Sequence, residues 1–436
     1  MLELQCFSSL LTIELRKSES DDLDFKTIGL QQPGFIRILA QSNGLGAVEV
    51  QAEPEITSWD TLRQQLGDVQ PDFNRSAGIP PACYADDALL APERRAVFHQ
   101  GWVGLGRSDR WPNPGDYSAL DIGGVPLIVV RSKSGELKAF ANSCRHRGSQ
   151  ILSGDGNCKK LKCPFHWWTY DLDGRLKVYP RMENALDFNP DDFGLVEFPL
   201  QTNSGFAFVS FDGQPPSFDE WLAEFNSYHQ AWSLDQWTTT RVRELEVNCN
   251  WKTFIEVFNE YYHLPMVHPD SINWLYPEPD AVDEVSGRYT TQFGATEGAA
   301  ALMADTQQHA LPQAPGLAGR EARGTRYTWI YPNLSFALSQ DSMWIYQAFP
   351  LAADRCRVIQ TICFPGASVE LADFEQRATH YYNRIDDALD EDLPFLEQQQ
   401  VGLNSPFARP GRFGALEPSV GKFAWWYAQQ MLQQLD

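Results

Sequence analysis

The chain has 436 residues, of which 43% are hydrophobic and 13% aromatic, and its 35 Lys and Arg against 57 Asp and Glu give a net charge of −22. At roughly 100–200 residues per domain, this length predicts two or three domains and excludes a disordered chain. The negative charge, with no basic run, excludes a nucleic-acid partner. No apolar run reaches about 18 residues, and the first residues resemble no targeting signal, so we expect a cytoplasmic protein without a membrane span.

The first half of the chain divides into three regions. Residues 1–75 form a polar leader with one strand-like piece at 34–40 and no functional motif. Residues 76–100 contain a helical pattern over 84–100, and we expect this helix to pack on the C-terminal domain. Residues 101–213 alternate short runs of Val, Ile, Phe and Tyr with Gly- and Asp-containing turns, which predicts a small all-β domain.

Residues 214–436 begin at a linker, Pro215–Pro216, and have mixed periodicity. A helix is expected over 251–262 and a long helix over 369–400. Between them lie four strand-like runs, at 288–293, 326–338, 343–349 and 356–364. Strands in sequence followed by a helix predict an α+β domain with an antiparallel sheet.

Eight cysteines in a chain of this length are too sparse for a disulfide framework, so metal ligation or buried thiols are the default interpretations. One group reads Cys144-x-His146, sixteen residues, then Cys163-x-x-His166. A single tetrahedral zinc is one possible occupant. Zinc fingers usually pair two cysteines in each loop, whereas here each loop carries one thiolate and one imidazole. That layout suits a two-iron cluster with two thiolates on one iron and two imidazoles on the other.

The two loops resemble those of Rieske proteins, which are usually written Cys-x-His-Arg-Gly and Cys-Pro-(Tyr/Phe)-His. The residues that match are Cys144, Arg145, His146, Arg147 and Gly148, then Cys163, Pro164, Phe165 and His166. The resemblance implies that Cys144, His146, Cys163 and His166 hold a [2Fe-2S] cluster. The family commonly has Gly after the second histidine, where this chain has Trp167, and Cys158 fits neither loop and is expected to be an ordinary thiol.

A second group contains His263 and His268, five residues apart. On an unbroken helix this spacing would turn the two rings to different faces. Pro265 disfavours helical geometry at Leu264, so we expect the helix to end near His263 and the chain to bring His268 back to the same point. The alternative is two unrelated histidines beside a helix end.

This segment resembles the mononuclear-iron motif of Rieske oxygenases. The matching residues are Asn250, Trp251, Lys252, Glu256, Glu260, Tyr262, His263 and His268. Two imidazoles and one carboxylate on one face of Fe(II) leave positions open for O2 and a substrate. By the same resemblance Asp392 is the third ligand, with Glu397 and Gln399 or Gln400 in supporting positions. Asp387 and Asp390 are the alternatives for the carboxylate.

The resemblance also implies a catalytic role for Glu260, three residues before the first histidine. In the family an acid here links a cluster histidine of one subunit to an iron-bound histidine of the next, by accepting imidazole N–H bonds. Many ring-hydroxylating members have Asp at this position. The Glu of this chain is similar to that of members acting on quaternary ammonium compounds, such as the choline, glycine betaine and carnitine oxygenases. The alternative is a plain acid on a helix surface.

The chain as a whole is identified as similar to the terminal oxygenase (alpha) subunit of a Rieske non-haem iron system over about 79–400. This resemblance implies a Rieske domain at 101–213, then a helix-grip (START-like) catalytic domain with an antiparallel sheet at 214–436. It implies a [2Fe-2S] cluster, a mononuclear Fe(II), O2 as co-substrate, and electrons from NAD(P)H through a separate reductase or ferredoxin. It also implies a homotrimer in which electrons cross between subunits.

Two hypotheses remain for the identity of the substrate. One is monooxygenation of a small quaternary ammonium or betaine compound, by hydroxylation or N-demethylation, for which aromatic faces would form a cage. The candidates for such a cage are Trp274, Tyr276, Trp329, Tyr331, Trp344 and Tyr346. The other is ring hydroxylation or O-demethylation of an aromatic acid, for which these aromatics would line an apolar pocket. From another class, a Rieske electron carrier would need neither His263 nor His268.

Overall fold

A computed structural model describes residues 6–7, 10–11, 58–275 and 278–435. The strand-like piece at 34–40 lies outside them. The chain forms two compact units, 1–62 and 63–436. In the first, β1 (Cys6–Phe7) and β2 (Leu10–Leu11) pair antiparallel, and α1 (Trp59–Gly67) crosses the boundary between the units. Within the described part of the chain, no helix has the length and apolar character needed to cross a bilayer.

The helix expected over 84–100 is a series of short segments instead. These are α2 (Ala82–Ala85), η1 (Asp87–Leu89), α3 (Leu90–Glu93) and η2 (Arg94–Phe98). Asp86 is extended, with ψ 111°, and its side chain accepts a hydrogen bond from Ala88 N, so the pattern breaks there. Segments α3 and η2 pack against the C-terminal helix α10 (Pro418–Leu435).

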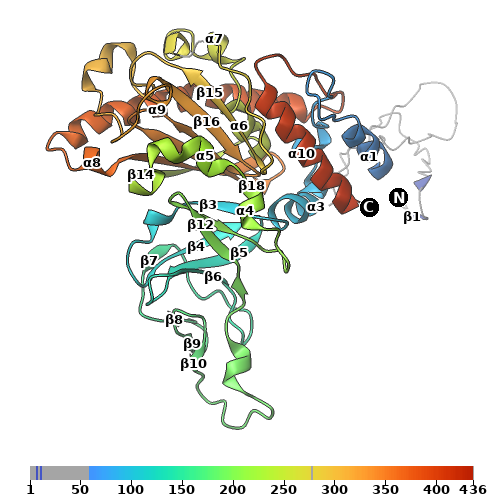
Figure 1. Ribbon diagram of the computed structural model, residues 1–436. Helices are drawn as coiled ribbons and strands as arrows, with labels where there is room; N and C mark the ends of the chain where they lie inside the picture. The colour runs from blue at the N-terminus through green and yellow to red at the C-terminus, as the bar shows by residue number, and fades with distance from the viewer. Residues whose placement is uncertain (1–5, 8–9, 12–57, 276–277, 436) are drawn as a thin grey trace, which may run out of the picture. The chain divides into compact units, whose positions relative to one another are not determined.

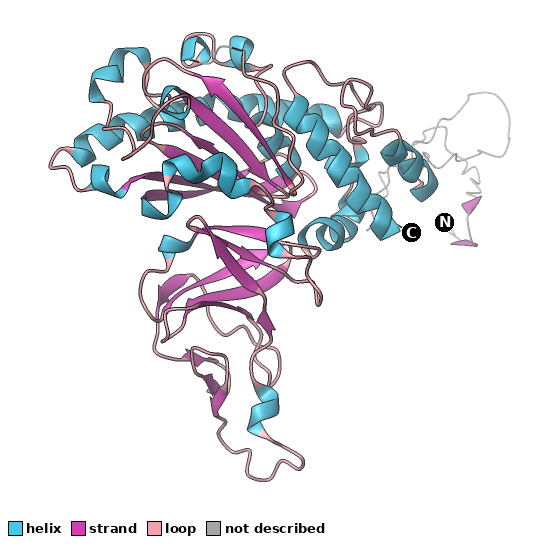
Figure 2. Cartoon of the chain, in the orientation of Figure 1, coloured by secondary structure: helices cyan, strands magenta, loops and turns pink. Residues whose placement is uncertain are grey.

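The next part is all β, as predicted (Figure 2). A five-stranded sheet has the order β11-β6-β5-β4-β7, and two three-stranded sheets have the orders β12-β13-β3 and β10-β9-β8. The strands are β3 (Val103–Arg107), β4 (Asp116–Ile122), β5 (Val125–Arg131), β6 (Leu137–Ala141), β7 (Asp155–Asn157), β8 (Leu161–Lys162), β9 (Thr169–Tyr170), β10 (Leu176–Val178), β11 (Glu197–Phe198), β12 (Leu200–Asn203) and β13 (Phe206–Val209).

The C-terminal part is built on a six-stranded antiparallel sheet of order β14-β19-β18-β17-β16-β15, so the α+β prediction is confirmed. Its strands are β14 (Trp237–Val247), β15 (Tyr289–Ala295), β16 (Gly324–Ile330), β17 (Leu334–Leu338), β18 (Met343–Ala352) and β19 (Arg355–Pro365). The single run expected at 326–338 is two strands, because a turn at 331–333 reverses the chain. The sequence patterns missed β14 and α10.

Successive side chains along each strand point to opposite sides, so the two faces of this sheet carry different residues. On one face Leu334, Phe336 and Ile345 join an apolar core with Phe206 of β13. The other face is covered by three helices, α6 (Trp251–Val257), α9 (Phe374–Leu403) and α10, which Figure 1 shows beside the sheet. The metal-binding candidates lie on this helical side.

Strand β3 approaches the six-stranded sheet closely enough to require glycine at position 104. A Cβ at Gly104 would lie 2.8 Å from Leu334 Cβ, closer than real Cβ atoms come to one another. The Gly104 backbone donates to Asn333 Oδ1 (3.2 Å), and its carbonyl accepts from Gln347 Nε2 (2.9 Å). The backbone of β3 is thus attached to the sheet through hydrogen bonds with the side chains of Asn333 and Gln347.

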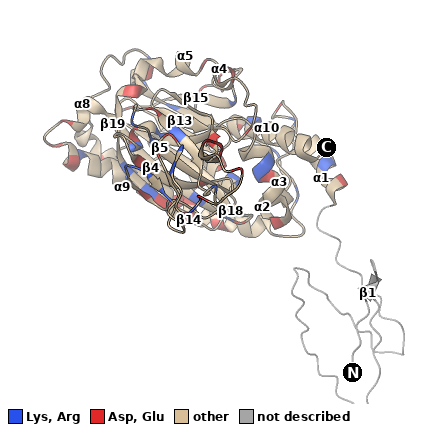
Figure 3. Cartoon of the chain, turned by 90° about the horizontal axis from the view of Figure 1, so that it is seen from below, with Lys and Arg blue, Asp and Glu red and all other residues tan. Residues whose placement is uncertain are grey.

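In the view of Figure 3, positions with Lys and Arg are interspersed along the described ribbon with positions of Asp and Glu.

One ion pair in the second unit is fully buried. Lys252 of α6 has no exposed surface and pairs with Glu93 of α3, which is 3% exposed. The Lys252 ammonium also donates to Cys83 O (2.8 Å). Glu93 accepts from Trp251 Nε1 (2.8 Å) and from Tyr427 Oη of α10 (2.6 Å). Four helical elements, α2, α3, α6 and α10, therefore meet at one pair of charges.

We expect Lys252→Met to destabilise the fold by about 3–5 kcal/mol, because Glu93 would be left buried without its counter-charge. Urea unfolding of the purified protein measures this. Lys422→Met is the control, since it removes an exposed pair with Glu284 and should cost at most about 1 kcal/mol. Equal losses in the two variants would contradict a special role for the buried pair.

Candidate metal centres

The four cluster candidates come together at the tips of two loops. Cys144 and His146 lie between β6 and β7, and Cys163 and His166 lie between β8 and β9. The imidazole centroids of His146 and His166 are 4.6 Å apart, and the two thiols are hydrogen-bonding neighbours. Both cysteines are buried, whereas both histidines are partly exposed. The structure therefore brings two sulfurs and two imidazoles into one group.

Tyr170 and Trp168 support these loops. Tyr170 Oη lies 3.4 Å from Cys144 Sγ and accepts from Arg145 N (3.1 Å). The ring of Trp168 stacks on His146 at 5.0 Å. Burial raises the pKa of the Cys144 thiol, and the Tyr170 hydroxyl opposes this by stabilising the thiolate. Among the polar atoms that the structure describes, His146 Nδ1 is buried without a hydrogen-bond partner, as a nitrogen reserved for a metal would be.

Trp167, which stands where the family commonly has glycine, does not obstruct the loop. Its backbone is left-handed, with φ 62°, the conformation that glycine adopts most easily. Its side chain is 61% exposed, and the Lys162 ammonium lies 3.6 Å from its ring centroid. Cys158 is outside the loops, and its backbone N donates to Gly115 O (2.9 Å).

His263 and His268 stand at the two ends of a short helix, α7 (Leu264–Val267). The preceding helix α6 ends at Val257, so the prediction that one helix continues to 262 is wrong. Pro265 lies in the first turn of α7, where its missing N–H is tolerated, rather than ending the longer helix. The predicted convergence of the two rings occurs through this separate turn, with ring centroids 5.2 Å apart.

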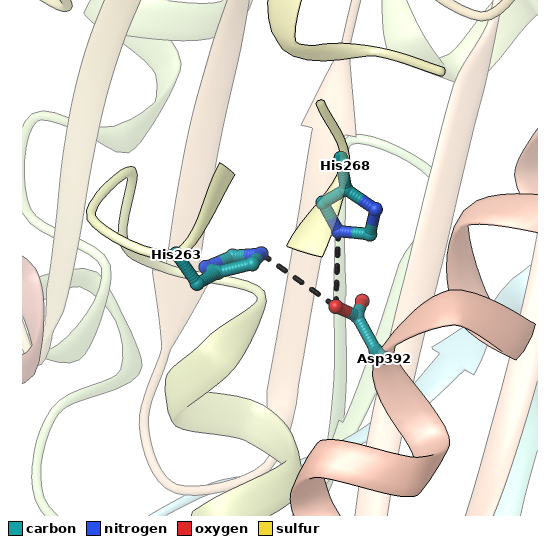
Figure 4. A group of neighbouring side chains, drawn as sticks. All are labelled: His263, His268 and Asp392. Atoms are coloured by element: carbon teal, nitrogen blue, oxygen red, sulfur yellow. Dashed lines mark ion pairs between the residues drawn. The ribbon is translucent and has the colours of Figure 1, made fainter. Parts of the chain in front are cut away.

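Asp392 of α9 meets both imidazoles (Figure 4). Its Oδ1 lies 3.0 Å from His268 Nε2 and 3.6 Å from His263 Nε2. One ligand atom from each of the three residues lies within 4.8 Å of the others. The alternatives Asp387 and Asp390 are exposed on α9. Of the expected supporting residues, Gln400 accepts from Asn250 N (2.8 Å), Glu397 accepts from Asn248 Nδ2 (2.9 Å), and Gln399 is exposed.

Each histidine has its second nitrogen held by a carboxylate. Glu260 Oε1 lies 2.5 Å from His263 Nδ1, and Glu391 Oε2 lies 2.6 Å from His268 Nδ1. Ser271 Oγ also donates to Glu391, at 2.6 Å. A carboxylate at Nδ1 fixes the proton there, so both Nε2 atoms present lone pairs toward Asp392. Sequence reasoning missed Glu391, because nothing in a helix rich in acids separates it from its neighbours.

The charge distribution fits a cation between these three residues. Burial alone would lower the pKa of His268, but the carboxylates of Asp392 and Glu391 more than offset it and raise the pKa. Asp392 Oδ1 is buried and, among the described residues, receives no hydrogen bond. Two imidazole nitrogens and one carboxylate are the donor set of the 2-His-1-carboxylate iron site. The residues present therefore fit a mononuclear Fe(II).

A cavity of about 60 Å³ opens beside this group. Its apolar walls combine aliphatic side chains with six aromatic ones, namely Phe254, Phe258, Tyr261, Tyr327, Trp344 and Tyr346. Of the six aromatics expected to line a pocket, Trp344 and Tyr346 do so. Trp329 and Tyr331 share their face of the sheet but pack against Phe423 of α10. Trp274 is 46% exposed, and Tyr276 lies outside the described residues.

The aromatic walls come from two sides, α6 and the sheet. The ring centroids of Phe258 and Tyr346 lie 4.6 Å apart. Tyr327 of β16 and Trp344 of β18 lie 6.3 Å apart, with Ala337 of β17 paired to both of them in the sheet register. Helical position could have revealed Phe254 and Phe258, which precede the histidines on the same segment.

Two protein families match parts of this chain. Residues 101–199 match the Rieske [2Fe-2S] domain family, and residues 234–433 match the family described as ring hydroxylating alpha subunit (catalytic domain). A relative in Chromohalobacter salexigens, the glycine betaine monooxygenase oxygenase subunit, is 29% identical over 86% of this chain and 89% of its own.

Two groups of crystal structures share the fold. A quaternary ammonium Rieske monooxygenase has a TM-score of 0.70 and 22% identity, with 84% of this chain and 98% of that chain covered. Naphthalene 1,2-dioxygenase from Rhodococcus has a TM-score of 0.72 and 20% identity, with 86% and 98% covered. At these identities the similarity concerns the fold.

We expect Asp392→Ala to lose the mononuclear iron and to retain the cluster, because Asp392 touches only the two-histidine group. Metal analysis should fall from about three irons per chain to about two, while the visible absorption of the cluster remains. Asp390→Ala, on an exposed face of the same helix, should keep all the iron. Retention of about three irons in Asp392→Ala would contradict the assignment.

Proposed function

Because the chain belongs to the Rieske non-haem iron oxygenases, we propose that it monooxygenates a small quaternary ammonium or betaine compound, by hydroxylation or by N-demethylation. It is the oxygenase component of a Rieske system, and the match over 234–433 rules out the alternative of a Rieske electron carrier. One observation supports the proposed substrate class. Aromatic side chains, here called the aromatic array, line the cavity beside His263, His268 and Asp392.

A methylated ammonium group has no N–H to donate, so hydrogen bonds cannot recognise it. Aromatic faces attract such a cation through their negative quadrupole, and the attraction strengthens away from water. Tyr327, Trp344, Tyr346 and Phe258 offer faces or edges from two sides of the cavity. The relatives named for glycine betaine and carnitine support the same substrate class.

In this proposal His263, His268 and Asp392 hold the mononuclear iron, and Cys144, His146, Cys163 and His166 hold the cluster. The bound iron supplies activation of O2. The chain itself fixes the two imidazoles: Glu260 keeps the proton on His263 Nδ1, as Glu391 does for His268. The aromatic walls orient the substrate and exclude water from the cavity.

The electron must reach the iron from elsewhere in the assembly. In Figure 1 the cluster hairpin β8–β9 and helix α7 lie at opposite ends of the second unit. We propose that the chain is a homotrimer in which Glu260 connects the cluster of a neighbouring subunit to His263, and that a separate reductase or ferredoxin delivers electrons from NAD(P)H. The domain limits proposed for this arrangement are 101–213 for the cluster domain and 214–436 for the catalytic domain, with 1–75 as a leader and 76–100 as a helical connection.

A substrate panel tests the proposed chemistry. With the reductase supplied, glycine betaine, carnitine or choline should stimulate O2 consumption and yield either formaldehyde or a hydroxylated product, because the aromatic array binds their methylated nitrogen. The Asp392→Ala protein is the blank for uncoupled O2 use. Turnover of vanillate alone would overturn the proposal in favour of hydroxylation or O-demethylation of an aromatic acid.

Glu260→Ala should slow steady-state turnover by roughly 10–100-fold, because His263 loses the carboxylate that orients it and links it to the neighbouring cluster. The variant should retain iron, and reductase should still reduce its cluster at the normal rate in stopped flow. Asp270→Ala, an exposed acid beside His268, is the matched control and should be near normal. A slow cluster reduction in Glu260→Ala would place the defect before the step assigned to this residue.

A further inference from the structure

We propose that Glu256 relays protons from solvent toward the metal group, through a second cavity that lies on the other side of Glu260. Insertion of one atom of O2 into a C–H bond reduces the other atom to water, which takes up two electrons and two protons. The reductase supplies the electrons, so the protons must come from solvent. The inference therefore rests on the oxygenase activity and is independent of the substrate class proposed above.

The two cavities share a wall. The cavity beside His263, here called the iron cavity, has a volume of about 60 Å³, and the second, here called the polar cavity, about 220 Å³. Val257 and Glu260 line both, so their side chains separate one cavity from the other. Arg409 and Arg412 line the polar cavity and are exposed, so it reaches solvent. Solvent therefore comes within one layer of side chains of the iron cavity.

The polar cavity offers a position for ordered water. Thr253 lines it and is 1% exposed, and among the described residues its Oγ1 has no hydrogen-bond partner. Buried hydroxyls are nearly always hydrogen-bonded, so an unpartnered one facing a cavity marks a binding position for water. A cavity of this volume has room for several waters. Thr253 and Glu256 are three residues apart on α6 and share one helical face, so this water lies beside the carboxyl of Glu256.

The surroundings of Glu256 suit a group that carries protons near neutral pH. Burial raises the pKa of its carboxyl to about 7, against the hydrogen bond from Tyr84 Oη (2.8 Å) and the Lys252 ammonium, and the charge of Glu417 adds to the increase. Burial also raises the pKa of Glu417, and the charge of Glu260 adds to it. A carboxyl whose pKa lies near the working pH both takes up and releases protons readily.

The relay passes Glu260 without changing its protonation. Glu260 Oε1 is bonded to His263 Nδ1, and its Oε2 accepts from the backbone N of Tyr262 and of His263. Val257 has no polar atom, so rotation of its side chain opens the shared wall to a chain of waters. Solvent protonates Glu256 from the rim, and Glu256 releases the proton to water at this wall. Glu260 continues to orient His263 throughout.

Glu256→Gln tests the relay, because the amide keeps the shape of the side chain but carries no exchangeable acid proton. Turnover should fall by about 100-fold, and the solvent deuterium isotope effect should increase as proton delivery becomes limiting. The parent rate should decrease as the pH rises through about 7, since only the protonated carboxyl donates, and this decrease should be absent in Glu256→Gln. Glu375→Gln, an exposed acid at the start of α9, is the control and should match the parent.

Infrared spectroscopy of the oxygen-free holoenzyme gives a measurement that needs no turnover. A protonated-carboxyl stretch should titrate near pH 7, shift in D2O because the cavity holds exchanging water, and be missing in Glu256→Gln. Tyr84→Phe removes a hydrogen bond that stabilises the charged carboxylate, so it should raise the pKa of Glu256. The infrared titration and the decrease in rate should then both move to higher pH.

The activity assays use whichever compound of the substrate panel is turned over, vanillate included, so failure of the proposed substrate class leaves this test intact. Iron content and cluster absorption verify that each variant is folded and loaded. A pH profile and an isotope effect equal to those of the parent in Glu256→Gln would overturn the inference even if the rate fell, because lost packing changes neither. A carboxyl stretch that does not shift in D2O, or a titration unmoved in Tyr84→Phe, would overturn it as well.

Discussion

The burial of one ammonium group, that of Lys252, determines how the catalytic helices are assembled. A charge without exposed surface is tolerated only when its partners are fixed in place. Its partners come from α3 and from the carbonyl of Cys83, while Tyr427 of α10 completes the set around Glu93. The segment that follows α6 in the chain carries His263 and His268. The two histidines therefore follow a helix that an ion pair and hydrogen bonds hold against three others, α2, α3 and α10.

Asn250 extends the same anchoring to the helix that supplies the third ligand. Its side chain caps α6 by accepting from Lys252 N, at 3.0 Å. Its backbone N donates to Gln400 of α9, two turns beyond Asp392. Residues 250–252 thus connect the histidine segment and the carboxylate helix. These residues of the iron motif therefore act by holding the two helical segments together, and in the structure they lie apart from the three-residue metal group itself.

Many of the metal-binding residues could be predicted from motifs whose members are close together in the sequence. The residues that were missed depend on packing between segments that are far apart in the sequence. Cys144 and His146 are close in sequence, as are Cys163 and His166. These four cluster ligands could therefore be predicted without knowledge of the fold. Asp392 came from family resemblance alone, because nothing local distinguishes it from the exposed acids nearby. Glu391 was not found for the same reason. The cavity walls depend on which helix covers each part of the sheet, and that information is absent from strand patterns.

The register of the sheet places Ala337, which does not line the cavity, between two residues that do. The size of its side chain therefore affects the width of the cavity. Strands two apart in a sheet are separated by about 9.6 Å, yet the rings of Tyr327 and Trp344 lie 6.3 Å apart. They lean together over Ala337, whose single methyl group leaves room between them. Ala337 therefore acts as a spacer. A larger side chain at position 337 would press the two rings apart and so reshape the cavity without replacing any residue that lines it.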